Sequence, residues 1–113
     1  MRFEFIETSI FTKRISALRL DDQLRDLQMA LVENPEAGTV DAGTGGLRKV
    51  RMADPRRGKG KRGGARVHYL LLPHSERIYL LYVYGKDEAD TLTRDEKKQL
   101  RAIVEAIKHE VSR

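Results

Sequence analysis

The apolar positions of this chain change their spacing several times, and each change predicts an element of secondary structure. Residues 1–7 alternate, with Phe3 and Phe5 on one side, which predicts a short strand with one buried face. Two segments at helical spacing follow, and together they predict a helical hairpin. Their apolar stripes are Phe11, Ile15 and Leu18 in the first segment, and Leu20, Leu24, Leu27 and Leu31 in the second.

Polar residues at the ends of the helical segments predict where the helices begin and end. The dipeptide Asn34-Pro35 is expected to end the second helix. "TRDE" at 93–96 fits a capping box at the start of a third helix, whose apolar stripe lies between Leu100 and Val111. The expected caps of the hairpin helices are Thr8 or Ser9 for the first and Asp21 or Asp22 for the second.

The middle of the chain alternates with period two in three segments, 47–53, 66–72 and 77–85, which predicts three strands. The last of them is apolar on both faces, as in a central strand. The order of elements predicts an α+β fold in one domain spanning residues 1–113. In it an antiparallel sheet, made of the N-terminal strand plus a three-strand meander, carries the helical hairpin and the C-terminal helix on one face.

The same alternation assigns the strand side chains to faces. Lys49, Arg51 and Arg66 fall on the face turned away from the helices. Facing side chains of neighbouring antiparallel strands lie within ~5 Å, so these three predict one cationic cluster on an open sheet face. Lys86 follows the last strand and is expected to reach the same area. The face expected to pack on the helices carries Val50, Met52, Val67, Tyr69 and Leu71.

Charge is concentrated in the same region. Nine basic side chains and one acid lie between Arg48 and Arg66, a local charge of +8, within a chain whose net charge is +5. A solvated basic loop would explain the charge alone, but like charges across neighbouring strands destabilise a sheet, which favours binding of an anion such as phosphate. The residues expected to bind RNA around the cluster are Arg48, Arg56, Arg57, Lys59, Lys61, Arg62 and His68.

Several other functions lack their sequence signals. The chain has no cysteine, and its histidines and acids show no metal-ligand spacing, so neither a metal nor another cofactor is expected. Residues 58–63 match G-x-G-x-x-G, but a strand follows where a dinucleotide site needs a helix. No helix carries a basic stripe for a DNA groove. No apolar run approaches the ~20 residues of a membrane span, and no leader is expected.

Three stretches occur in an order that resembles a known family: "NPEAG", then "GTGGLRKVRMADPRRGKGKRGGARVHYLLL", then "YVYGKDEADTLTRDEKKQL". They resemble the RelE/HigB superfamily of toxins from prokaryotic type II toxin–antitoxin modules, and most closely its HigB-like branch. The resemblance implies a RelE-like fold and a cytoplasmic endoribonuclease that cuts mRNA in the A site of the 30S ribosomal subunit. It also implies a cognate helix-turn-helix antitoxin, through which alone the toxin would be linked to DNA.

By position, the resemblance assigns the catalytic roles to Lys49, Arg51, Arg66 and Lys86. Cleavage without a metal uses the ribose 2′-OH as the nucleophile, so the protein must position the RNA, accept a proton and bind the phosphate. Arginine suits the phosphate, and Arg66 and Arg51 are assigned to it. Lys49, crowded by these two cations, is a possible base, and Lys86 is expected to bind phosphate or assist the leaving group.

Two positions depart from RelE-type toxins. Asp87 stands where such toxins can have an arginine, and Thr93 where they can have a catalytic tyrosine. The general base is therefore open. His68 is expected to be a half-exposed sheet residue more often than a catalyst. The alternative function is a non-catalytic RNA- or ribosome-binding module, which the same basic face would fit. Substitutes for the missing tyrosine are Tyr82, Tyr84 and His68.

Overall fold

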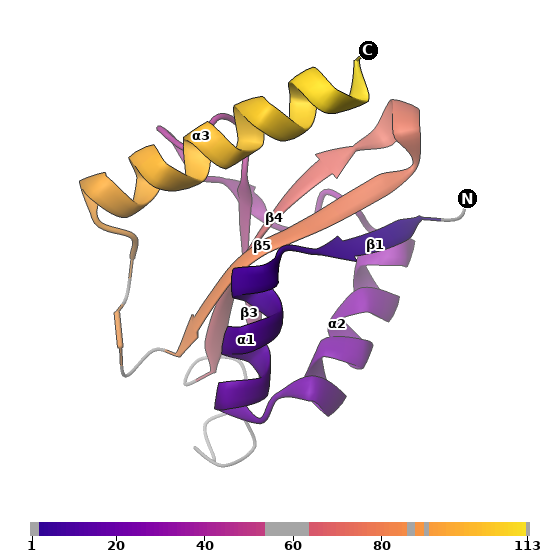
Figure 1. Cartoon of the computed structure of the whole chain (residues 1–113). Coiled ribbons are helices and arrows are strands. Elements are labelled where there is room, and N and C mark those ends of the chain that lie inside the picture. The colour runs from indigo at the N-terminus through magenta and orange to yellow at the C-terminus, as the bar shows by residue number, and fades with distance from the viewer. Residues whose placement is uncertain (1–2, 54–63, 86–87, 90, 113) are drawn as a thin grey trace.

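A computed structural model describes residues 3–53, 64–85, 88–89 and 91–112 of the chain (Figure 1). Its helices and strands follow the predicted order. They are β1 (Glu4–Glu7), α1 (Ser9–Leu18), α2 (Asp21–Glu33), β2 (Thr39–Val40), β3 (Arg48–Met52), β4 (Ala65–Leu72), the 3₁₀ helix η3 (Pro73–Ser75), β5 (Arg77–Gly85) and α3 (Arg94–Val111).

The strands form a single five-stranded sheet in the order β1-β5-β4-β3-β2. The predicted meander of β3, β4 and β5 is confirmed, and each pair within it is antiparallel. The two-residue strand β2, which the sequence analysis missed, extends the meander at the β3 edge. The sheet is mixed, because β1 pairs parallel with β5. The helical hairpin carries the chain from β1 to the far edge, and the antiparallel strands then return it to β1.

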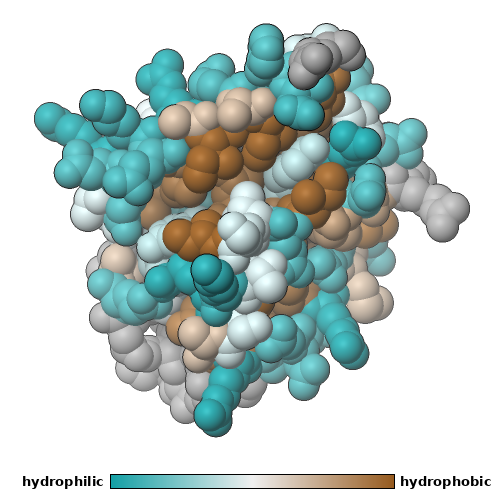
Figure 2. Space-filling view, in the orientation of Figure 1, coloured by the Kyte–Doolittle hydropathy of each residue, from teal (hydrophilic) through white to brown (hydrophobic). Residues whose placement is uncertain are grey.

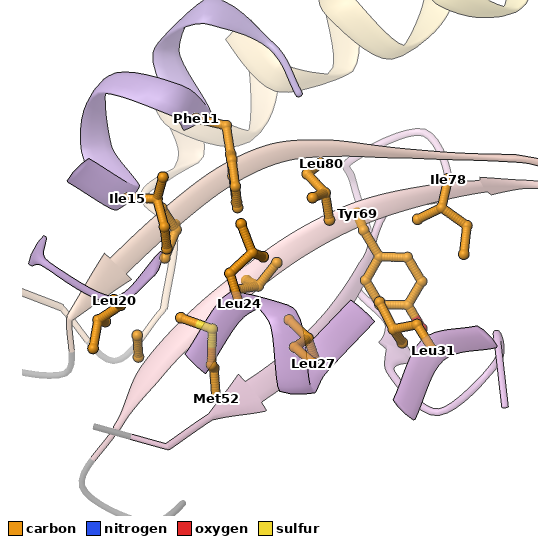
Figure 3. Close-up of a cluster of buried hydrophobic side chains, with 13 residues drawn as sticks. Phe11, Ile15, Leu20, Leu24, Leu27, Leu31, Met52, Tyr69, Ile78 and Leu80 are labelled. Carbon is orange, nitrogen blue, oxygen red and sulfur yellow. The ribbon is translucent and has the colours of Figure 1, made fainter. Parts of the chain in front are cut away.

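Helices cover both faces of the sheet, so the prediction of helices on one face is wrong. Phe11 of α1 and Leu24 and Leu27 of α2 pack with Tyr69 and other side chains of one face (Figure 3). The other face packs against α3, and Figure 1 shows the strands passing between α3 and the hairpin. The side chains that form this second cluster are Leu47, Leu70, Leu81, Tyr84, Leu92, Leu100 and Val104.

Strand β5 explains why two layers of helix are needed, because it is apolar on both faces. Leu80 and Val83 belong to the cluster under α1 and α2, whereas Leu81 and Tyr84 belong to the cluster under α3. A register shift between His68 and Tyr69 of β4 leaves Leu81 without an opposite residue. Such a bulge places an extra side chain on one face of the strand. At this bulge, β5 contributes the Leu81 side chain to the cluster under α3.

The helix ends agree with the predictions at two of three starts. Thr8 caps α1, with its side chain accepting a hydrogen bond from the Phe11 backbone, and Thr93 forms the predicted capping box with Glu96. Helix α2 begins differently, because Leu20 occupies its N-cap position and provides no side-chain hydrogen bond in the described chain. Asp21 and its neighbouring acid lie in the first turn instead, where carboxylates stabilise the positive end of the helix dipole.

The surface is not uniformly polar. Figure 2 shows apolar areas bordered by hydrophilic side chains on the face it displays. Apolar areas of this kind are available for contact with a protein partner. No helix in the described part of the chain is both long and apolar enough to span a membrane. The exposed large apolar side chains are Ile10, Met29, Val32, Val40 and Ile103.

Candidate functional site

The register of β3, β4 and β5 aligns polar side chains in two rows on the α3 face. Arg51 lies opposite Arg66, so Lys49, two residues earlier on β3, is a diagonal neighbour of Arg66 on the same face. Diagonal neighbours in a sheet are separated by roughly 7–8 Å. The register thus agrees with the predicted placement of these three cations, although their roles stay predictions. The first row is Arg51, Arg66 and Tyr84, and the second is Lys49, His68 and Tyr82.

Burial increases along the first row from Arg51 to Tyr84, and in the second row it is greatest at His68 in the middle. Arg51 is exposed and Lys49 is half-buried, whereas only 6% of Arg66, 2% of Tyr84 and none of His68 is exposed. The sequence analysis expected an open face and a half-exposed histidine, and both expectations are wrong. The physical reason is the α3 cluster, which covers this face of the sheet and includes Tyr84 itself. His68 is buried completely, and its assignment to RNA binding stays a prediction.

Three buried polar atoms of the rows have no hydrogen-bond partner among the described residues: Arg66 Nη1, His68 Nδ1 and the Tyr84 hydroxyl. Buried polar groups in native proteins are almost always hydrogen-bonded, and an unsatisfied one costs about 1–3 kcal/mol. The three residues are neighbours in space. Arg66 lies opposite Tyr84, and the His68 and Tyr84 rings stack with their centroids 5.8 Å apart. A group that binds the native protein would remove this cost, which is typical of a functional site.

A hydrogen-bonded network links this region to α3. Asp41, which follows β2, contacts His68 Nε2 through Oδ2 at 3.0 Å and Lys97 Nζ through Oδ1 at 3.1 Å. Lys97 lies on α3 and also donates to the Ala42 carbonyl at 3.0 Å. The Thr44 hydroxyl donates to the Asp41 carbonyl at 2.6 Å. The network therefore holds the His68 ring through Asp41, which is itself held by Lys97 of α3.

The protonation states within the network follow from burial and hydrogen bonding. Burial lowers the pKa of His68 from 6.5, and the hydrogen bond with Asp41 offsets only part of the effect. Burial acts to raise the pKa of Asp41, but hydrogen bonds from His68 and Lys97 outweigh it and leave that pKa below 3.8. At neutral pH, His68 is therefore neutral and donates from Nε2 to the Asp41 carboxylate, a tautomer inferred from this contact. Its Nδ1 is then a buried acceptor.

We predict that His68 makes the protein less stable in mild acid. The pKa of His68 is lower in the folded than in the unfolded chain, so as the pH falls through 6.5 the unfolded chain takes up this proton first. Stability is then lost as the pH falls below 6.5 toward the pKa of the folded state. In thermal unfolding at pH 7.5 and 5.5, His68→Gln should show a smaller drop in Tm than the native protein. An equal drop in both proteins would contradict the assignment.

Arg48, another predicted RNA-binding residue, lies apart from the two rows. Arg48 is on the opposite face from Lys49, where its Nη1 donates to the Gly38 carbonyl at 2.8 Å and its Nη2 lies 3.5 Å from Glu36 Oε1. Arg48 therefore ties β3 to the segment before β2, apart from the two rows. Five RNA-binding candidates and one catalytic candidate lie outside the described residues: Arg56, Arg57, Lys59, Lys61, Arg62 and Lys86.

Sequence reasoning missed Asp41 and Lys97 and left Tyr84 unassigned. Asp41 had one signal, because it is the only acid in 37–53 and directly precedes the glycine-rich stretch. Lys97 had no such signal, because the apolar stripe of α3 does not indicate which face of the sheet the helix covers. In the described part of the chain, no group of three or more His, Cys, Asp or Glu side chains could hold a metal ion.

Residues 6–112 match the family model described as the RelE toxin of the RelE / RelB toxin–antitoxin system. The fold and the match together define a toxin of a toxin–antitoxin module, with an antitoxin as its partner. The chain belongs to the RelE toxin family. The match does not distinguish the HigB-like branch from the rest of the family, so membership in that branch stays a prediction.

Proposed function

We propose that this toxin is a ribosome-dependent endoribonuclease that cuts mRNA in the A site of the 30S subunit. The observation that carries the proposal is the row on the α3 face, in which the exposed Arg51 leads to the buried Arg66 with its unpartnered Nη1. Two guanidinium groups held side by side on paired strands suit a phosphate, because each is planar, permanently charged and rich in donors. The position of Lys49 beside them adds a third cation.

In the proposed reaction, the ribose 2′-OH of the message attacks the adjacent phosphorus and the 5′ oxygen of the next nucleotide leaves. The products are a 2′,3′-cyclic phosphate and a 5′-OH end. Arg66 and Arg51 bind the phosphate oxygens and offset their growing charge. Lys49 accepts the 2′-OH proton, and a second proton reaches the departing oxygen. Lys86 is proposed to assist that oxygen, and this residue lies outside the described part of the structure.

The structure favours Lys49 over His68 as the proton acceptor. His68 is fully buried, and Nε2 is committed to Asp41, so neither ring nitrogen faces solvent. Lys49 is half-buried on the neighbouring strand, directly opposite His68, and its side chain is accessible to a bound ribose. His68 is better suited to a supporting role, in which it holds the neighbouring side chains in place. Lys49 is therefore the base of the proposal.

The partners follow from the family and the charge. The antitoxin is proposed to carry a helix-turn-helix domain, as in the HigB-like branch, so that DNA is linked to the toxin only through it. The apolar surface areas in Figure 2 suit such a protein contact. The basic segment between Arg48 and Arg66 suits ribosomal RNA in the cytoplasm.

Mapping the 5′ ends of cellular mRNA after a short induction tests the proposal. We expect new 5′-hydroxyl ends at discrete, in-frame positions within translated regions, because the A site presents codons in register. The alternative function, a module that binds RNA or the ribosome without cutting it, predicts inhibited translation with intact messages. Growth inhibition without new ends would therefore replace the proposed function by the alternative.

A further inference from the structure

We propose that the Tyr84 hydroxyl is a third donor to the phosphate bound by Arg66, which makes Tyr84 a catalytic residue of the proposed function. Tyr84 lies on β5 directly opposite Arg66 of β4, so the two side chains are cross-strand neighbours on the α3 face. Side chains in such pairs have Cβ atoms about 4.5–5.5 Å apart. An anion bound at Arg66 would therefore lie on the same sheet face as the Tyr84 side chain.

The burial of the Tyr84 hydroxyl supports the presence of a ligand beside it. Only 2% of Tyr84 is exposed, and its oxygen has no hydrogen-bond partner among the residues that the structure describes. The same holds for Nη1 of Arg66, the residue opposite. One such atom would be an isolated exception, but a hydroxyl and a guanidinium nitrogen that both lack partners, on residues at facing positions, indicate one shared ligand. Both groups donate hydrogen bonds, so the ligand is an acceptor, and the charge of Arg66 makes it an anion.

The hydroxyl keeps its proton at neutral pH. Burial raises the pKa of Tyr84 to about 12, and the charge of Arg66 offsets only part of this effect. Tyr84 therefore serves as a hydrogen-bond donor and not as the base that accepts the 2′-OH proton. This role differs from that of Lys49, and it requires no proton transfer to or from the phenol.

The surroundings hold the ring in place. The Tyr84 ring stacks on His68 with an interplanar angle of 26° and lies 5.9 Å from the Tyr82 ring. His68 is fixed by Asp41, which is in turn held by Lys97 of α3. The network thus supports the Tyr84 ring through its stacking on His68. A donor that is held in place before the substrate arrives loses little freedom on binding it.

Tyr84→Phe tests the inference, because it removes the hydroxyl and keeps the ring and its stacking. The matched control is Tyr79→Phe, a tyrosine of the same strand and cluster that lies opposite Leu70 instead of an arginine. Two measurements are made on each full-length protein: titration with inorganic phosphate followed by NMR, and the rate of mRNA cleavage on programmed ribosomes. Circular dichroism melts confirm that the variants fold.

We expect Tyr84→Phe to weaken phosphate binding and slow cleavage, each by ~10–100-fold, since a hydrogen bond to a charged group is lost. Tyr79→Phe should change neither, and both Tm values should stay near that of the native protein. If the native protein cuts no message but binds phosphate through Tyr84, the subsite stands and the proposed function fails. Unchanged phosphate binding in Tyr84→Phe, or no phosphate binding by the native protein, would overturn the inference even where cleavage is observed.

Discussion

Replacing Arg66 by methionine is expected to lower the rate of mRNA cleavage by ~10²–10³-fold while leaving the protein at least as stable as before. The loss of rate follows from removing a donor aimed at the charge that develops on the phosphate. Arg66 is 6% exposed with an unpartnered Nη1, and replacement of buried charged groups by well-packed apolar side chains of similar volume is often neutral or stabilising. Single-turnover cleavage and urea unfolding measure the two effects.

Two controls make this result specific. Arg25→Ala removes an exposed arginine of α2, on the other side of the sheet, and should leave both cleavage and stability unchanged. Arg66→Lys keeps a charge but loses the planar fork, and should recover only a small part of the rate. If Arg66→Met unfolded at much lower urea concentration, the guanidinium would be a structural group, and its assignment to the phosphate would be wrong.

The second large effect is expected at Lys49. Both Lys49→Met and Lys49→Arg should lower the cleavage rate by ~10²-fold or more, because a general base contributes about 10²–10⁴-fold and arginine does not release its proton in proteins. The two variants should differ in binding, since Lys49→Arg keeps the positive charge on β3 and with it most of the affinity for RNA. Cleavage rates at saturating toxin separate the two contributions.

Near-native cleavage by Lys49→Arg would show that the lysine contributes charge alone. The base would then have to be sought elsewhere, and the assignment of Lys49 would be withdrawn. Lys13→Met is the matched control, since Lys13 is an exposed lysine of α1 on the opposite side of the sheet. It should cut at the native rate, so that a general loss of positive charge is excluded as the cause.

The pattern of apolar residues was enough to predict most elements and that the three cations share one face of the sheet, although not that α3 covers this face. Alternation along β3 and β4 is local, so it placed Lys49, Arg51 and Arg66 together before any contact was known. The packing of α3 could not be predicted in the same way. An apolar stripe shows that a helix is buried on one side, but it does not identify the sheet face that covers it. The two apolar faces of β5 were the available clue.

The polar network could not be predicted from local sequence patterns either. Asp41 and His68 are separated by 27 positions in the chain, and their contact depends on the turn before β3 and on the pairing of β3 with β4. The bulge beside His68 also breaks the simple alternation of β5, so that Leu81 and Tyr84 share the α3 cluster. Only the folded arrangement shows that Tyr84 faces Arg66 with an unpartnered hydroxyl.

The most direct test of the account uses the substrate's own nucleophile. Ribosomes are programmed with two messages that differ only by a single 2′-deoxynucleotide on the 5′ side of the A-site bond that the toxin cuts. We predict that the all-ribose message yields a 2′,3′-cyclic phosphate and a 5′-hydroxyl, and that the deoxy message stays intact while the toxin still binds. Cleavage of the deoxy message, or fragments that begin with a 5′-phosphate, would contradict the proposed chemistry of the cationic rows.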